Sequence, residues 1–143
     1  LISFELIDYR TFANTYKGPR FDRIISCEML EAVGAEYFDD FFRSMEKLLT
    51  PEGVVALKTI SLPDQRWQSY LNSVDFIQER IFPGGCLTCI SALASSMARS
   101  SKFIIQDIHE YVGFRNQNFT YLRILDLVLI MLVLSSYGAS SSI

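Results

Sequence analysis

The sequence has few of the residues that mark several large classes of protein. Its three cysteines, Cys27, Cys86 and Cys89, are odd in number and too sparse for a disulfide framework, which favours reduced thiols in a cytoplasmic protein. Its single histidine, His109, has no Cys or His at ligand spacing nearby, so no metal site is predicted. Thirteen Lys and Arg residues against sixteen Asp and Glu give a net charge of −3, and no basic run occurs. This balance argues against nucleic acid as a partner.

Long hydrophobic runs are also missing. The most apolar segment, residues 124–134, is interrupted by Asp126 and is shorter than the about 20 residues needed to span a bilayer. The simplest interpretation is a buried strand or helix. Contact with a membrane surface, or an origin outside the native fold, are the alternatives. The chain begins at Leu1 without a recognisable signal or transit peptide, and we expect it to be a piece of a longer protein.

Half of the 143 residues are hydrophobic, enough for one packed domain. Alternating or continuous apolar runs predict strands in a single sheet, the first three of them mutually parallel, near residues 2–8, 22–27, 54–60 and 102–112. Apolar residues at helical spacing predict helices over residues 37–49, 64–82 and 88–99, the last with Thr88 as a candidate N-cap. Strands that alternate with helices predict an α/β fold with a mostly parallel sheet.

Three loops should meet at the carboxyl edge of this sheet, where open α/β sheets bind ligands: residues 8–10, 27–34 and 61–63. In the second loop, Glu28 and Glu31 lie three residues apart after a buried strand. Such a pair could contain a general base or a residue that holds a ligand. The alternative is acidic charge at a helix N-terminus, which the helix dipole favours.

The first loop offers a polar and an aromatic side chain. Asp8 could accept a hydrogen bond from an adenine amine or a ribose hydroxyl, and Tyr9 has a face on which a ring could stack. An Asp that follows a strand is also a common turn former, so both interpretations of Asp8 stay open.

Three segments in series resemble the cyclopropane-fatty-acyl-phospholipid synthases. They are residues 8–10 (Asp-Tyr-Arg), 21–34 (Phe-Asp-Arg-Ile-Ile-Ser-Cys-Glu-Met-Leu-Glu-Ala-Val-Gly) and 81–87 (Ile-Phe-Pro-Gly-Gly-Cys-Leu). The likeness implies a Rossmann-like class I methyltransferase sheet that is truncated at its N-terminus, because the family's glycine-rich cofactor loop lies upstream of this chain. It divides the chain into a partial methyltransferase domain, 1–123, and an apolar tail of unclear origin, 124–143.

The resemblance also implies a chemistry. The family uses S-adenosylmethionine to methylate the double bond of an unsaturated phospholipid acyl chain and closes a cyclopropane ring, a step in lipid biosynthesis. The position of Glu31 matches the catalytic carboxyl that holds a bicarbonate base. Cys27 matches a backbone position beside this anion and the cofactor, and Asp8 and Tyr9 match the loop that covers the adenine. The implied partners are the acyl chain, with a membrane surface and a second copy of the chain as further candidates.

The sequence departs from the family at two positions. Lys58 stands where bacterial members have a bicarbonate-binding histidine, and Asn116 is nearest to an expected tyrosine. Because the family's glycine-rich cofactor loop lies upstream of this chain, the 143 residues alone are expected to be inactive. Three alternatives stay open: a methyltransferase that acts on a small amine, one that acts on a sterol-like lipid, and a non-catalytic remnant.

Overall fold

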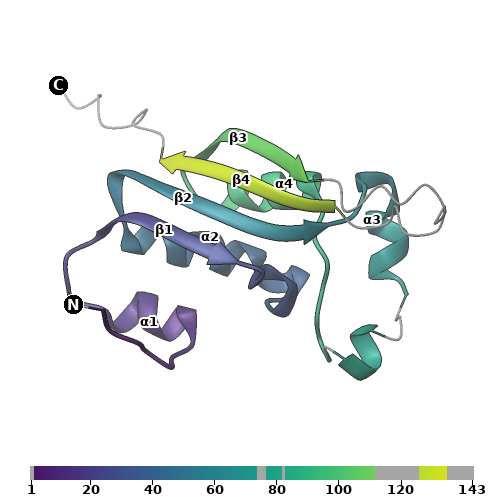
Figure 1. Cartoon of the computed structure of the whole chain (residues 1–143), viewed down its shortest axis with the longest axis horizontal. Coiled ribbons are helices and arrows are strands. Elements are labelled where there is room, and N and C mark those ends of the chain that lie inside the picture. The colour runs from purple at the N-terminus through teal and green to yellow at the C-terminus, as the bar shows by residue number, and fades with distance from the viewer. Residues whose placement is uncertain (1, 74–76, 82, 112–125, 135–143) are drawn as a thin grey trace.

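The computed structural model describes residues 2–73, 77–81, 83–111 and 126–134 of the chain. A four-stranded sheet in the order β1-β2-β4-β3 forms its centre (Figure 1). Its strands are β1 (Phe21–Cys27), β2 (Leu49–Ser61), β3 (Phe103–Tyr111) and β4 (Asp126–Leu134). β1 runs parallel to β2, whereas β4 runs antiparallel to both β2 and β3.

Helices cover one face of this sheet. Helices α2 (Phe38–Leu48) and α4 (Ile90–Ser100) pack on each other beneath the strands, and α1 (Tyr9–Thr15) packs on α2 (Figure 1). Helix α3 (Asp64–Leu71) and the short helical turns η1 (Leu30–Ala32), η2 (Ala35–Tyr37) and η3 (Ile77–Ile81) lie in the connections. No helix in the described part of the chain is long and apolar enough to cross a membrane.

The core lies between the sheet and these two helices. Successive strand residues point to opposite faces, so Val55 and Leu57 of β2 are buried on the helix side. They meet Phe41 and Phe42 of α2, whose apolar residues recur at helical spacing and form one stripe. On the other face of the sheet, Ile25 of β1 is 78% exposed. Burial is therefore one-sided over the described residues.

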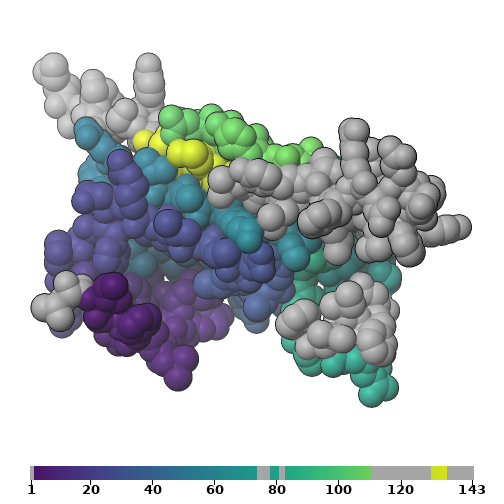
Figure 2. Space-filling view, in the orientation of Figure 1, coloured from purple at the N-terminus to yellow at the C-terminus, as the bar shows by residue number. Residues whose placement is uncertain are grey.

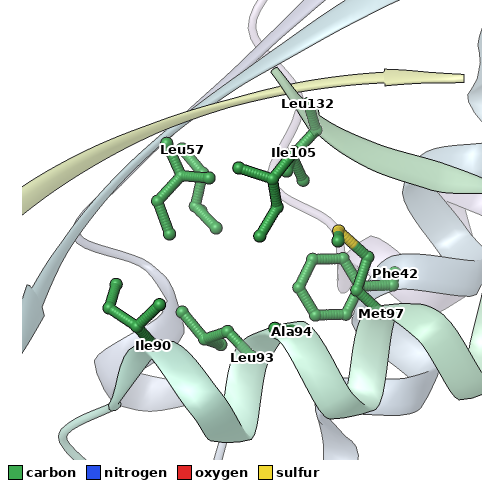
Figure 3. A pocket seen from close by; sticks show the side chains of 9 residues that line it. Phe42, Leu57, Ile90, Leu93, Ala94, Met97, Ile105 and Leu132 are labelled. Carbon is green, nitrogen blue, oxygen red and sulfur yellow. The ribbon is translucent and has the colours of Figure 1, made fainter. Parts of the chain in front are cut away.

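The contact between α4 and the sheet leaves a cavity of only about 10 Å³ (Figure 3). Apolar side chains from both layers line it: Phe42, Leu57, Ile90, Leu93, Ala94, Met97, Ile105, Ile130 and Leu132. A space of this size with no polar partner does not hold an ordered water. The helix-covered face is thus a packed core with no room for a ligand.

Several expectations from the sequence are confirmed. The 22–27 and 54–60 strands pair in parallel, the 102–112 strand belongs to the same sheet, and a helix lies between the first two. The apolar segment near the C-terminus is a strand, as one of the alternatives held, with Ile130 and Leu132 buried in the core. How residues 1–123 and 124–143 divide into domains stays a prediction.

Three expectations about the elements are wrong. Residues 2–8 form no strand, because no neighbouring strand in the described structure offers them hydrogen bonds. They are exposed at the surface, where Figure 2 shows the first residues of the chain. The sheet is not mostly parallel, since β4 enters it antiparallel to both neighbours. The 64–82 helix ends at Leu71, before the separate turn η3.

The N-terminus of α4 also differs from the prediction. The helix begins at Ile90 instead of Thr88, and its N-cap residue is Cys89, whose side chain makes no capping bond. The carboxylate of Asp64 accepts a hydrogen bond from the Ser91 amide at 3.0 Å instead. Thr88 belongs to a bridge with Ser61, which ties the loop before α4 to the end of β2.

Candidate functional site

Asp8 starts helix α1 and is held by two neighbours in the chain. Its Oδ1 accepts hydrogen bonds from the backbone amides of Arg10 and Thr11, as an N-cap residue does, and also from Arg10 Nε at 3.0 Å. Its Oδ2 accepts from the second guanidinium nitrogen at 2.9 Å. Hydrogen bonding to Arg10 lowers the pKa of Asp8 to about 2. The carboxylate is therefore ionised and fixed in orientation.

A cleft of about 470 Å³ lies between this turn and the loop that follows β1. Its walls come from two stretches of sequence some twenty residues apart: Ile7, Asp8, Tyr9, Arg10, Met29, Ala32, Val33 and Tyr37. The structure therefore brings Asp8 and Tyr9 together with the loop that carries Glu31, but the predicted reason is wrong, because residues 2–8 form no strand and the third predicted loop, 61–63, does not line the cleft. Arg10 belongs to the predicted loop 8–10 but was given no role of its own, and Tyr37 was missed because it has no strand-end position that marks it.

Tyr9 is more firmly packed than a free stacking platform would be. Its ring meets Phe41 edge to face with the centroids 5.8 Å apart, and the Arg10 guanidinium lies 5.5 Å from the ring centroid. Burial raises the pKa of the Tyr9 phenol, and the hydroxyl has no hydrogen-bond partner among the described residues. Tyr9 thus anchors the wall of the cleft to the core.

The loop after β1 begins with an unusual residue. Glu28 has a φ of 51°, in the left-handed region that side chains other than glycine rarely adopt. Its amide donates to the Lys58 carbonyl at 2.8 Å, and its carboxylate accepts from Lys58 Nζ at 2.7 Å. This hydrogen bond is the main reason that the pKa of Lys58 is raised, with smaller contributions from Cys27 and Glu31. The two ion-paired side chains are partly exposed at the end of the sheet.

Glu31 lies three residues further on, in different surroundings. Its Oε1 accepts hydrogen bonds from Thr59 Oγ1 at 2.9 Å and from the Ile60 amide, both at the end of β2. Its Oε2 is buried without a hydrogen-bond partner among the described residues. A buried carboxylate oxygen is costly unless a donor reaches it, which makes this unpartnered atom chemically unusual.

Two buried threonines lie in the surroundings of Glu31. Thr59 and Thr88 are completely buried, and their hydroxyl oxygens lie 3.5 Å apart. The Thr88 hydroxyl donates to the Ile60 carbonyl, and the Cys86 amide donates to the Glu31 carbonyl at 2.7 Å. These contacts join the ends of β1 and β2 to the loop before α4. Sequence reasoning missed both threonines as site residues, because Thr59 reaches Glu31 only through the fold and Thr88 reaches Thr59 only through its bridge with Ser61.

The remaining candidates lie apart from the cleft. Cys27 ends β1 opposite Lys58, is exposed, and does not line the cleft. Cys86 and Cys89 are buried free thiols, and burial raises the pKa of Cys86 to about 11 and also raises that of Cys89, so neither is a reactive thiolate. His109 lies exposed on β3 beside Asp107. Among the described residues, no three His, Cys, Asp or Glu side chains are grouped to hold a metal ion.

Comparisons with known proteins show the family of this chain. The family model described as mycolic acid cyclopropane synthetase matches residues 2–123. The tuberculostearic acid methyltransferase of Mycobacterium tuberculosis is 35% identical over 92 residues, which are 64% of this chain and 20% of that protein. The cyclopropane-fatty-acyl-phospholipid synthase of Escherichia coli is 33% identical over 110 residues, 77% of this chain and 26% of that protein. The chain therefore spans about a quarter or less of these curated relatives.

Solved structures agree in fold. A mycolic acid cyclopropane synthase in complex with S-adenosylhomocysteine superposes with a TM-score of 0.63 at 18% identity, over 84% of this chain and 57% of that one. The geranyl diphosphate C-methyltransferase of Streptomyces coelicolor gives 0.62 at 11% identity, over 92% of this chain and 54% of that one. The fold is the α/β fold of class I S-adenosylmethionine-dependent methyltransferases. By the extent of the family match and the order of its elements, the chain belongs to the mycolic acid cyclopropane synthetase family of enzymes.

Proposed function

We propose that this chain takes part in methyl transfer from S-adenosylmethionine to the double bond of an unsaturated phospholipid acyl chain, with closure of a cyclopropane ring. The observation that carries the proposal is the buried Oε2 of Glu31, which has no hydrogen-bond partner among the described residues. It belongs to the loop that also lines the cleft beside Asp8. A proton-bearing group bound there would satisfy the carboxylate oxygen close to the cofactor cleft.

The cleft fits the nucleoside part of S-adenosylmethionine. Asp8 presents an ionised carboxylate that can accept from an adenine amine or a ribose hydroxyl, and Ile7, Met29 and Val33 supply apolar wall for a ring. When bound, the cofactor supplies an electrophilic methyl group, whose transfer to the double bond leaves positive charge on the acyl chain. The proposed role of Asp8 and Tyr9 is to bind and orient the adenosine, away from the reacting carbon.

Ring closure requires removal of a proton from the newly added methyl group, so the site needs a base and must exclude water. The proposed base is bicarbonate bound beside Glu31, where its hydroxyl would donate to Oε2 and Lys58 would supply positive charge nearby. Bound there, bicarbonate would supply the base. Glu31 then holds this base in place, with Thr59 and the Ile60 amide fixing the other carboxylate oxygen. The backbone at Cys27 is proposed to border the same anion.

The experiment uses the protein expressed from its complete reading frame. It is incubated with vesicles of an unsaturated phospholipid and with S-adenosylmethionine that carries a fully deuterated methyl group. The proposal predicts an acyl chain with a ring methylene that retains all but one of the methyl deuterium atoms. Three results would contradict it: deuterium in an intact methyl group on the acyl chain, deuterium transferred to an added amine or sterol, or no deuterium in any acceptor.

A further inference from the structure

Arg10 joins the two stretches of the chain that form the cleft. Its guanidinium makes two hydrogen bonds with the Asp8 carboxylate, at 3.0 and 2.9 Å. The same group lies over the rings of Tyr9 and Tyr37, at 5.5 and 5.4 Å from their centroids. All four side chains line the cleft. Arg10 thus connects the cap of α1 to η2, the turn that leads into α2.

The hydrogen bonds of Asp8 are divided unequally between its two oxygens. Oδ1 accepts from two backbone amides and from Arg10 Nε, so its lone pairs are fully used. Oδ2 accepts only from the second Arg10 nitrogen. A carboxylate oxygen can accept two or more hydrogen bonds, so the remaining acceptor capacity of Asp8 is on Oδ2.

We propose that Arg10 is a positioning residue for the bound nucleoside: it holds Asp8 so that only Oδ2 can accept from an adenine amine or a ribose hydroxyl. The inference rests on the proposed use of the cleft for S-adenosylmethionine. Arg10 affects binding only by orienting Asp8. Contacts with two tyrosine rings hold the guanidinium in place, and its two hydrogen bonds hold the carboxylate.

The chemistry of this contact requires arginine in particular. A guanidinium is planar and presents a fork of donors that matches both oxygens of a carboxylate, and it stacks on aromatic faces. A lysine ammonium group carries the same charge but has no planar fork of donors. Arg10→Lys should therefore keep the charge of the cleft and lose the orientation of Asp8.

The test is a double-mutant cycle on the complete gene product, with binding of S-adenosylhomocysteine measured by calorimetry. The variants are Asp8→Asn, Arg10→Gln and the double variant, with Arg10→Lys as the conservative change. Asn is as good an N-cap residue as Asp, so α1 should persist. Arg43→Gln is the matched control, because Arg43 also pairs with carboxylates but lies outside the cleft.

Each single variant at Asp8 or Arg10, including Arg10→Lys, should weaken binding by roughly ten-fold or more, the value of a hydrogen bond to a charged group. The double variant should bind no more weakly than Asp8→Asn alone, because Arg10 acts through Asp8. Arg43→Gln should bind as the wild type does. A merely structural role for Arg10 would instead give additive losses.

The outcomes separate this inference from the proposed function. Wild-type protein that fails to bind S-adenosylhomocysteine overturns the proposed function and the inference with it. Wild-type binding with additive losses in the double variant, or with full affinity in Arg10→Lys, overturns the inference and leaves the proposed function standing. Wild-type binding with the predicted non-additivity supports both.

Discussion

The loop after β1 places two glutamates three residues apart in opposite surroundings. Glu28 lies at the exposed end of the sheet, in a left-handed backbone conformation, with its carboxylate paired to Lys58. Glu31 is turned toward β2, where Thr59 and the Ile60 amide hold one oxygen and the other is buried. Two identical side chains in one loop therefore differ in exposure and in hydrogen bonding, because they contact different residues of β2.

Exchange of each carboxylate for an amide should separate the two glutamates most clearly. In Glu31→Gln the side-chain oxygen can still accept from Thr59 and Ile60, while an NH₂ group replaces the buried Oε2. The variant should fold and bind cofactor, and turnover by the complete gene product should fall roughly 10²–10⁴-fold, the usual range for loss of a proton-transfer group. Methyl incorporation into unsaturated phospholipid measures this effect.

Glu28→Gln is the control for this experiment. It removes one partner of an exposed ion pair, which contributes little in water, and it leaves the Glu31 pocket unchanged. Its turnover should stay near that of the wild type. Equal losses in the two variants would mean that the loop as a whole, and not Glu31, is responsible.

Removal of the hydroxyl that holds Glu31 should have a smaller effect. Thr59→Val keeps the shape of a fully buried side chain and deletes the donor to Glu31 Oε1. We expect a loss of about 1–3 kcal/mol in the free energy of unfolding, measured by urea denaturation, because a buried carboxylate oxygen loses a hydrogen bond.

Thr50→Val is the matched control, because Thr50 lies at the other end of β2 and its hydroxyl bonds only to the exposed Asp22. Its free energy of unfolding should change by about 0.5 kcal/mol or less. If the two valine variants are equally stable, Thr59 does not support the Glu31 carboxylate.

The backbone at Glu28 gives the smallest predicted difference. A left-handed conformation costs an L-residue roughly 1–2 kcal/mol, and glycine avoids this cost. Glu28→Gly should therefore be more stable than Glu28→Ala by about 1 kcal/mol, although both variants lose the ion pair with Lys58. Thermal unfolding of the two variants compares them directly. Greater stability of the alanine variant would show that the loop adopts another conformation in solution.

Local patterns in the sequence identified the parts of the fold that depend on local chemistry. The apolar stripe of residues 37–49 predicted α2, and the short apolar runs predicted β1 and β2 and their parallel pairing. Asp8 and Tyr9 also lie beside the loop of Glu31, although no strand precedes them in the described structure as the sequence predicted. The roles of Glu31 and Cys27 stay predictions.

Features that depend on contacts between residues far apart in the chain could not be predicted from the sequence. Residues 2–8 alternate as a strand does, but no neighbouring strand pairs with them in the described structure. The continuous apolar run of 126–134 suits a helix or a strand, and only its pairing with β2 and β3 decides between them. Nothing in the sequence marks Thr59 as a partner of Glu31, or Thr88 as a partner of Thr59.

The dependence of turnover on bicarbonate tests the central claim, that Glu31 holds the base, most directly. The complete gene product is assayed in buffer freed of carbon dioxide, and bicarbonate is then added back. The account predicts that wild-type turnover falls without bicarbonate and recovers to saturation, whereas Glu31→Gln stays slow at every concentration. A wild-type rate that does not depend on bicarbonate, or equal recovery in both proteins, would contradict the account.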